Sequence, residues 1–314
     1  MRISRYLGIE MNRMNRKTFL GLISLFLSFS CMSCAQPKVR TKDYVKQTSS
    51  YSQQGAAVYG KYLFQFTAGT VCDIYDLRRK RYVGQMSFEG SDQKHCDTAC
   101  FGWLKVNEKD EFPVIYVSGS QIWENKEHGL IWVYRIIHKR NWWGLELLQV
   151  IETPQIEDIG ICPDALLSEK DSTMWLMGWK TDLSKPLKDG SGAYLTFLKF
   201  KAPNINDGRL DNKGVRYTSL LMKDTLVSFD IQNAHIVQQG ICLRKKMVYI
   251  PYGCSTDGYQ GIDIVSLEEK RIVKNIDLIG TSVLEPEAVF FYKDEMYIAD
   301  QATTIKKIVE SKRK

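Results

Sequence analysis

The chain lacks the short motifs that identify most nucleophile, nucleotide and zinc-protease chemistry. It contains no Gly-x-Ser-x-Gly elbow, no His-Glu-x-x-His, no phosphate-binding Gly-x-x-x-x-Gly-Lys and no dinucleotide fingerprint. Helix signals are also scarce, because no stretch after residue 35 keeps the i, i+3, i+4, i+7 apolar spacing for three turns. The sequence therefore gives no support for those familiar activities or for a helical fold.

A nucleic-acid footprint is also missing. Residues 1–33 contribute +4 of the formal net charge of +7, which leaves +3 for the rest of the chain. No dense Lys/Arg stripe interleaved with aromatic residues remains there, so we expect no nucleic-acid partner.

The first 34 residues predict an export signal. Arg13, Arg16 and Lys17 form a basic region, and residues 18–30 form an apolar run. A run of about 13 residues is too short to span a bilayer and suits the apolar core of a signal peptide. We expect an exported protein of the periplasm or outer membrane.

Two cysteines at the end of this segment follow small residues, in a pattern that resembles the lipobox of bacterial lipoproteins. The resemblance implies acylation of Cys34, with Cys31 as the alternative, and a lipid anchor in the membrane. Cleavage after Ala35 by an ordinary signal peptidase is the other interpretation. Residues 35–52 then form a polar tether that could contribute a ring-closing strand, and residues 53–310 form one domain, which we expect to be monomeric.

Five short segments repeat one small pattern across that domain. They are QQGAAV (53–58), HCDTAC (95–100), CPDALL (162–167), QQGICL (238–243) and EPEAVF (285–290). Four are followed closely by an aromatic or β-branched run, and further strand-like runs separated by charged turns follow in the same order. A recurring unit of four short strands predicts an all-β fold, a β-propeller of four-stranded blades.

The spacing of the repeats predicts five blades. The second and third units are longer than the others, with insertions at residues 124–129, 139–144 and 180–193. Short strand-like runs near residues 218–221 and 226–229 leave six blades as the alternative. The last unit lacks a fourth strand, and residues 39–45 could supply it and close the ring.

The order of these motifs resembles secreted bacterial β-propellers, in the group that includes the teichoic-acid-biosynthesis-protein-C-like and NHL/SMP-30-like propellers. The motifs are Gln-Gly, Tyr-Leu-Phe, Ile-Tyr-Asp-Leu, His-x-Asp and later Glu-Pro-Glu before an aliphatic strand. SMP-30-like enzymes hold a divalent metal at the channel with Glu, Asn and Asp, and Glu287, Asp97 and Asp164 occupy comparable repeat positions here. The chain departs from that family's Glu-Gly, since Ala288 follows Glu287.

Alignment of the five segments places Gly55, Asp97, Asp164, Gly240 and Glu287 at one equivalent position. Equivalent positions at the start of the innermost strands surround the channel mouth of a propeller, so we expect the three carboxylates to converge there. Such oxygen ligands suit Ca²⁺ or Mg²⁺, and a nearby histidine would admit Zn²⁺ or Mn²⁺.

The alternative is that these polar residues only satisfy strand-end amides and ordered water. The candidate metal ligands are Asp97, Asp164, Glu287 and His95. The candidate ligand-binding residues at the mouth are Gln54, His95, Asp97, Asp164, Gln239, Glu285 and Glu287.

Tryptophan and cysteine give weaker signals. Trp123, Trp142 and Trp143 adjoin insertions and could form a sugar-stacking platform, but core burial is the favoured interpretation. Cys242 should face a residue near Tyr249 in a hairpin, which places it out of register with the next cysteine and favours a buried thiol.

Two functions follow as hypotheses. The first is a membrane-tethered, non-catalytic propeller that binds a glycan or an envelope protein at the channel mouth. The second is a metal-dependent enzyme, such as a lactonase, a hydrolase or a polysaccharide lyase. The chain's departure from the Glu-Gly motif favours binding.

Overall fold

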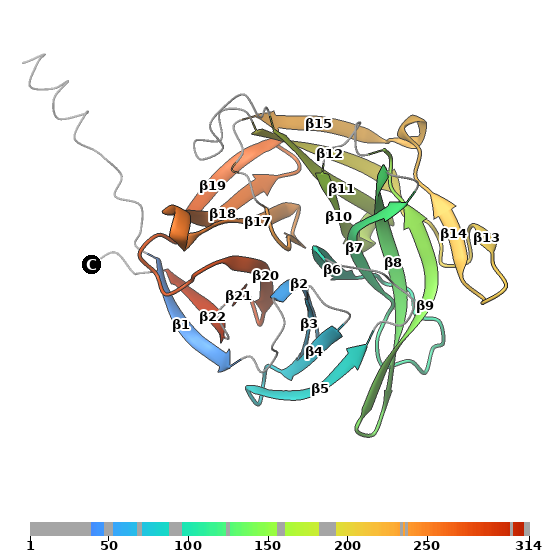
Figure 1. The fold of residues 1–314 in the computed structure, drawn as a ribbon, viewed down its shortest axis with the longest axis horizontal. Coiled ribbons are helices and arrows are strands. Elements are labelled where there is room, and N and C mark those ends of the chain that lie inside the picture. The colour runs from blue at the N-terminus through green and yellow to red at the C-terminus, as the bar shows by residue number, and fades with distance from the viewer. Residues whose placement is uncertain are drawn as a thin grey trace, which may run out of the picture. The chain divides into compact units, whose positions relative to one another are not determined.

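The strands of the computed structural model form five sheets that stand around a common axis (Figure 1). The structure describes residues 39–46, 53–67, 71–87, 96–123, 126–155, 161–181, 193–232, 235, 238–301 and 304–310. Each sheet contains an antiparallel meander of four strands. The all-β fold with five propeller blades is therefore confirmed.

The first two blades are built from consecutive strands. Blade 1 contains β2 (Gln53–Tyr59), β3 (Tyr62–Thr67), β4 (Val71–Asp76) and β5 (Arg81–Ser87). Blade 2 contains β6 (Thr98–Phe101), β7 (Ile115–Trp123), β8 (Lys126–Lys139) and β9 (Trp142–Glu152).

The remaining blades follow the same plan. Blade 3 contains β10 (Ile161–Ser168), β11 (Thr173–Thr181), β12 (Ala193–Lys201) and β15 (Val227–Gln232). Blade 4 contains β16 (Cys242–Arg244), β17 (Met247–Cys254), β18 (Tyr259–Ser266) and β19 (Arg271–Asp277). Blade 5 contains β20 (Pro286–Tyr292), β21 (Glu295–Asp300), β22 (Thr304–Glu310) and β1 (Val39–Lys46).

The ring closes through β1, which pairs with β22 as the outermost strand of blade 5. Val45 is 3% exposed there, and the hydroxyl of Tyr44 donates to the carbonyl of Leu77 in the turn after β4. The N-terminal part of the described chain thus completes the last blade and also contacts the first.

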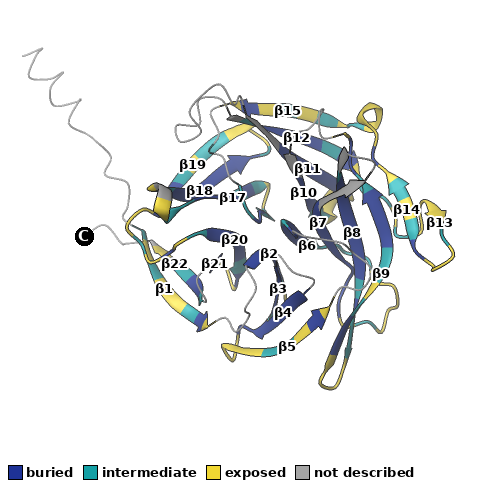
Figure 2. Ribbon diagram, in the orientation of Figure 1, coloured by how far each residue is buried: buried dark blue, intermediate teal, exposed yellow. Residues whose placement is uncertain are grey.

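The hydrophobic core is divided among the seams between blades, because successive residues of a strand point to opposite faces of its sheet. Leu63 packs against blade 5, whereas its neighbours Phe64 and Tyr62 pack against blade 2. Five clusters of buried side chains fill the five seams. Figure 2 shows that buried residues dominate the inner strands, and that exposed residues gather on outer strands such as β1, β5 and β15.

The alternative of a sixth blade is wrong. Residues 202–226 leave blade 3 after β12, and β13 (Arg209–Leu210) and β14 (Arg216–Ser219) join the outer edge of blade 2. There β14 pairs in parallel with β9, and the chain then returns through a 3-10 turn to β15. We call residues 202–226 the strap, because they connect the outer edges of two neighbouring blades.

The described helices are short 3-10 turns, at Glu169–Asp171, Met222–Asp224 and Ser255–Asp257. Among the described residues, no helix is long and apolar enough to cross a membrane. The signal peptide, the lipobox cysteines and most of the tether lie outside the described residues.

Candidate functional site

The five aligned positions occur where the innermost strands begin. The glycines allow close backbone contact between blades, whereas the carboxylates form polar contacts. The amide of Gly55 donates to the carbonyl of Cys96 at 2.8 Å, and the amide of Gly240 donates to the carbonyl of Glu287 at 2.8 Å. A Cβ atom on Gly55 would lie 2.8 Å from the Cys96 carbonyl, and one on Gly240 would lie 2.9 Å from the Asp97 carbonyl. The two glycines therefore allow the backbones of different blades to touch.

Hydrogen bonds through Thr98 also connect three blades. The amide of Ile241 in blade 4 donates to Oγ1 of Thr98 in blade 2 at 3.0 Å. The Thr98 hydroxyl in turn hydrogen-bonds to the carboxylate of Asp164 in blade 3. Three blades are thus joined by one buried threonine.

Two of the three aligned carboxylates belong to one electrostatic cluster. Asp164 is 3% exposed, and burial together with the negative charge of Asp97 holds its pKa well above the usual range for a carboxyl. Hydrogen bonds from Thr98 and Ser118 act in the opposite direction. The Oδ1 atom of Asp164 has no hydrogen-bond partner within the described part of the chain. These surroundings favour the protonated form of Asp164.

The third carboxylate, Glu287, bonds to a different group. It is 1% exposed, and the side-chain amide of Gln54 donates to its Oε2 at 3.3 Å. A similar pair lies nearby, where the amide of Gln239 donates to Oε1 of Glu285 at 3.4 Å. Four of the candidate ligand-binding residues therefore form two hydrogen-bonded pairs.

No three His, Cys, Asp or Glu side chains among the described residues form a group that could hold a metal. His95, the fourth candidate metal ligand, lies outside the described residues.

The cysteines of the described region are thiols. Cys242 faces Tyr249 across its hairpin, which confirms the register predicted from the sequence. Burial raises the pKa of Cys100 and of Cys242 to about 12. Both thiols therefore stay protonated at neutral pH and are poor nucleophiles.

The burial of Trp143 agrees with core packing, the interpretation that the sequence favoured over a sugar-stacking platform. Trp143 is 6% exposed and stacks on His138, with ring centroids 3.6 Å apart and an angle of 10° between the rings. It also makes a T-shaped contact with Tyr62 of blade 1, with ring centroids 5.3 Å apart. Trp142 is 56% exposed, and the side chain of Trp123 lies outside the described part. Trp142 and Trp143 therefore cannot present a shared surface.

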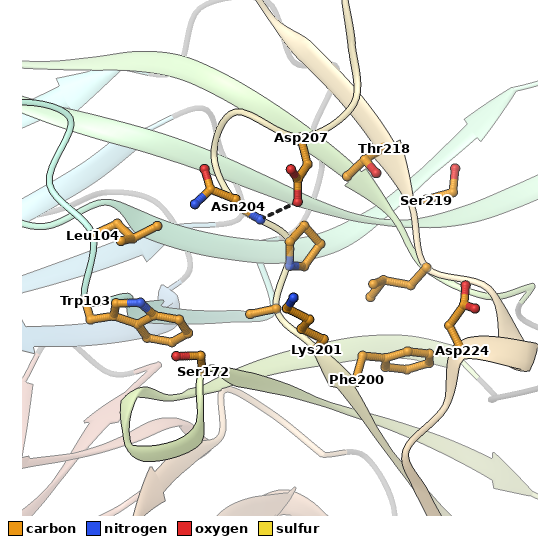
Figure 3. Close-up of a pocket in the computed structure, with 13 residues that line it drawn as sticks. Trp103, Leu104, Ser172, Phe200, Lys201, Asn204, Asp207, Thr218, Ser219 and Asp224 are labelled. Carbon is orange, nitrogen blue, oxygen red and sulfur yellow. Dashed lines mark hydrogen bonds between the residues drawn. The ribbon is translucent and has the colours of Figure 1, made fainter.

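A cavity of about 480 Å³ instead opens at the seam between blades 2 and 3, and a different tryptophan lines it. Trp103 and Leu104, just after β6, stand on one side, and Thr218, Ser219 and Asp224 of the strap stand on the other (Figure 3). The volume lies within the range of about 300–1,000 Å³ that is common for small-molecule sites.

The strap builds this cavity, and a buried side chain fixes its shape. Gln149 of β9 is 0% exposed, and its amide donates to the carbonyls of Asn204 at 2.9 Å and Asp207 at 3.0 Å. The turn is tightened by the amide of Asn204, which donates to the Asp207 carboxylate at 2.8 Å. The wall formed by residues 204–207 is therefore held in place without a ligand.

Several polar side chains on the cavity wall make no hydrogen bond or ion pair within the described part of the protein, and so could bind a ligand. Among the described residues, no hydrogen bond or ion pair engages the side chains of Lys201, Thr218 or Asp224. The hydroxyl of Ser219 is engaged, since it donates to Glu152 at 3.2 Å. The cavity thus combines an indole wall with an unpaired hydroxyl, an ammonium and a carboxylate.

A second polar cluster missed by the sequence reasoning surrounds His235 in blade 4. Its Nδ1 lies 2.8 Å from Oδ2 of Asp263, and its ring stacks on Tyr252 at a centroid distance of 4.0 Å. Asp263 and its partner Asn275 face each other across β18 and β19. A signal was present, because an Asp and an amide recur at the same register in blade 1, as Asp73 and Gln85.

Of two solved structures compared with the chain, the first supports the fold. The soluble aldose sugar dehydrogenase of Escherichia coli, in its apo form, is 7% identical with a TM-score of 0.50, over 87% of this chain and 100% of that one. The glutaminyl cyclase of Myxococcus xanthus is 7% identical with a TM-score of 0.45, over 86% of this chain and 96% of that one. No protein-family model matches the chain, and no curated protein matches it in sequence. At these identities the likeness extends to the propeller fold alone.

Proposed function

We propose that the protein is an exported propeller that binds a neutral carbohydrate in the cavity between blades 2 and 3. The observation that carries the proposal is the position of Trp103 opposite the unpaired polar groups of the strap. An indole ring offers a flat apolar face, against which the C–H groups of a pyranose ring can pack. The hydroxyls of the same sugar need hydrogen-bond partners, which the opposite wall offers.

The charges around the cavity favour a neutral ligand. Asp207 and Asp224 carry negative charge, and Lys201 supplies one positive charge. An acidic sugar would face two carboxylates with one ammonium as compensation, so its carboxylate would be repelled. Neutral hexoses and N-acetylhexosamines meet no such penalty, because amides and hydroxyls hydrogen-bond to either sign of charge.

The protein would meet such a ligand outside the cytoplasm. The basic and apolar leader supports export, and Cys34 is the proposed site of a lipid anchor. A tethered propeller that recognises a glycan would hold that glycan near the envelope. In this proposal the binding is non-catalytic, and the site differs from the channel mouth that the sequence suggested.

The test is calorimetric titration of the purified protein with neutral and acidic oligosaccharides. We expect at least one neutral oligosaccharide to bind with a Kd below about 1 mM, which corresponds to about 4 kcal/mol. Trp103→Ala should weaken that binding by about tenfold, close to 1.4 kcal/mol, because the stacking wall is lost. Thr218→Val removes one hydroxyl and should weaken binding by about fivefold.

Trp142→Ala is the matched control, because Trp142 is exposed and does not line the cavity. It should leave affinity unchanged. Equal losses in the Trp103 and Trp142 variants would contradict the assignment of the site, and no binding to any neutral glycan at millimolar concentration would contradict the proposed function. Thermal unfolding of each variant separates loss of binding from loss of fold, and the Thr218 variant preserves the test if Trp103→Ala unfolds.

A further inference from the structure

The cluster around His235 has the geometry of an oriented base. Asp263 accepts from His235 Nδ1 at 2.8 Å through Oδ2, and its Oδ1 accepts from the amide of Asn275 at 2.8 Å. The same Asn275 amide nitrogen also donates to the hydroxyl of Tyr252 at 2.8 Å. Both carboxylate oxygens are therefore held, and the carboxylate cannot rotate away from the imidazole.

The ring of His235 is held from its face as well as from its edge. It lies parallel to the ring of Tyr252, with an angle of 5° between them, and its centroid is 5.4 Å from that of Tyr259. The side-chain amide of Gln238 donates to the backbone carbonyl of His235. With Nδ1 donating to Asp263, the lone pair of the neutral imidazole lies on Nε2.

The Nε2 atom belongs to a partly exposed side chain. The side chain of His235 is 32% exposed, and no hydrogen bond engages Nε2 among the described residues. The carboxylate that His235 contacts is buried, since the Asp263 side chain is 2% exposed. The partners of His128 and His138 are glutamates whose side chains are 35% and 50% exposed.

We infer that His235 is a general base at a second site, separate from the carbohydrate cavity, and that this site hydrolyses carboxylic esters. Water gives a proton to Nε2 while its oxygen adds to the ester carbonyl carbon. The imidazolium formed is stabilised by the Asp263 carboxylate and returns the proton to the departing alcohol oxygen as the ester bond breaks. One water is consumed, and one acid and one alcohol are released, so no oxidant or metal enters the balance.

Ester chemistry suits the surroundings as well as the base. The rings of Tyr252 and Tyr259, whose centroids lie 5.1 Å apart, give the imidazole an aromatic border against which an acyl group can pack. An ester carbonyl is electrophilic enough for attack by water once a positioned base removes the proton.

The experiment measures hydrolysis of p-nitrophenyl acetate by the full chain, with imidazole at equal concentration as the reference. We expect the protein to exceed imidazole by at least tenfold, and His235→Gln to lose at least 90% of that excess. Asp263→Asn should also lower the rate, because an amide can hold the imidazole in the other tautomer. His138→Gln is the matched control and should keep the wild-type rate, since His138 lies outside the cluster.

A spectroscopic measurement reports on the geometry without a substrate. Long-range ¹H–¹⁵N spectra of the histidine side chains should show His235 with its proton on Nδ1, and Asp263→Asn should change that pattern. A rate no greater than that of imidazole, an unchanged rate in His235→Gln, or a proton on Nε2 of His235 in the neutral protein would each overturn the inference.

Discussion

Replacement of Gly240 by alanine tests whether the blades meet in backbone contact at the axis. The new Cβ atom would lie 2.9 Å from the Asp97 carbonyl oxygen, 3.0 Å from the Glu287 carbonyl oxygen and 3.0 Å from Ala288 Cβ. Two of these neighbours are main-chain atoms, so no side-chain rotation relieves the contact. The inner strands of blades 2, 4 and 5 would have to separate.

The expected change in the free energy of unfolding for Gly240→Ala is the sum of opposing contributions. Overpacking of a tight interior costs about 1–3 kcal/mol. Strand separation would stretch the hydrogen bonds from Gly240 to Glu287 and from Ile241 to Thr98, which are 2.8 and 3.0 Å long, and this adds about 1 kcal/mol. Alanine also lowers the conformational entropy of the unfolded chain, which stabilises the folded protein by about 0.4–1 kcal/mol. We therefore expect a net loss of about 2 kcal/mol in the free energy of unfolding.

The assay is thermal and urea unfolding of wild type, Gly240→Ala and Gly144→Ala, followed by circular dichroism. A loss of about 2 kcal/mol should lower the Tm by about 4–8 °C. Gly144→Ala is the control, because the three atoms nearest its Cβ belong to the ring of Trp142, which is 56% exposed and can move aside. Equal unfolding free energies for the two variants would refute the close approach of blades.

Two further predictions concern the buried carboxyl and the leader. The pKa of Asp164 is raised in the folded state, so the native protein keeps a proton that the unfolded chain releases above about pH 4. Wild-type stability should then fall as pH rises above that value, and Asp164→Asn should remove this fall; urea unfolding between pH 4 and 8 measures it, and parallel pH profiles would contradict it. Cys34→Ala should abolish incorporation of radiolabelled palmitate in a bacterial host, whereas Cys31→Ala should not, and labelling that survives Cys34→Ala would exclude Cys34 as the anchor.

Local sequence pattern was enough to predict the blades. In blades 1 and 4, short turns join all four strands, so the order and spacing of these strands follow directly from the local sequence. The hairpin that opposes Cys242 and Tyr249 is such a local feature, and so are the charged turns after β4 and β18. Alternating apolar residues on these strands then require neighbouring blades on both faces, which selects a closed ring.

The cavity and the His235–Asp263 contact could not be predicted from the sequence, because both depend on contacts between segments that are distant in the chain. Strand β14 has only four residues and joins blade 2 by parallel pairing with β9. Local periodicity in the sequence therefore cannot predict that it belongs to blade 2. The cavity walled by Trp103 depends on that placement. The bond between His235 and Asp263 joins residues 28 positions apart through the packing of blade 4. Gly55 and Gly240 were visible as repeats, but their role needs the neighbouring backbone.

The most direct test of carbohydrate binding in the cavity between blades 2 and 3 is an indole ¹H–¹⁵N spectrum recorded during titration with a neutral oligosaccharide. The chain has 7 tryptophans, and the signal of Trp103 can be assigned by its loss in Trp103→Phe. We predict that the Trp103 signal shifts in a saturable way while the Trp142 signal stays in place. A saturable shift of Trp142 with Trp103 unmoved, or no shift of any indole signal across the neutral glycans, would contradict it.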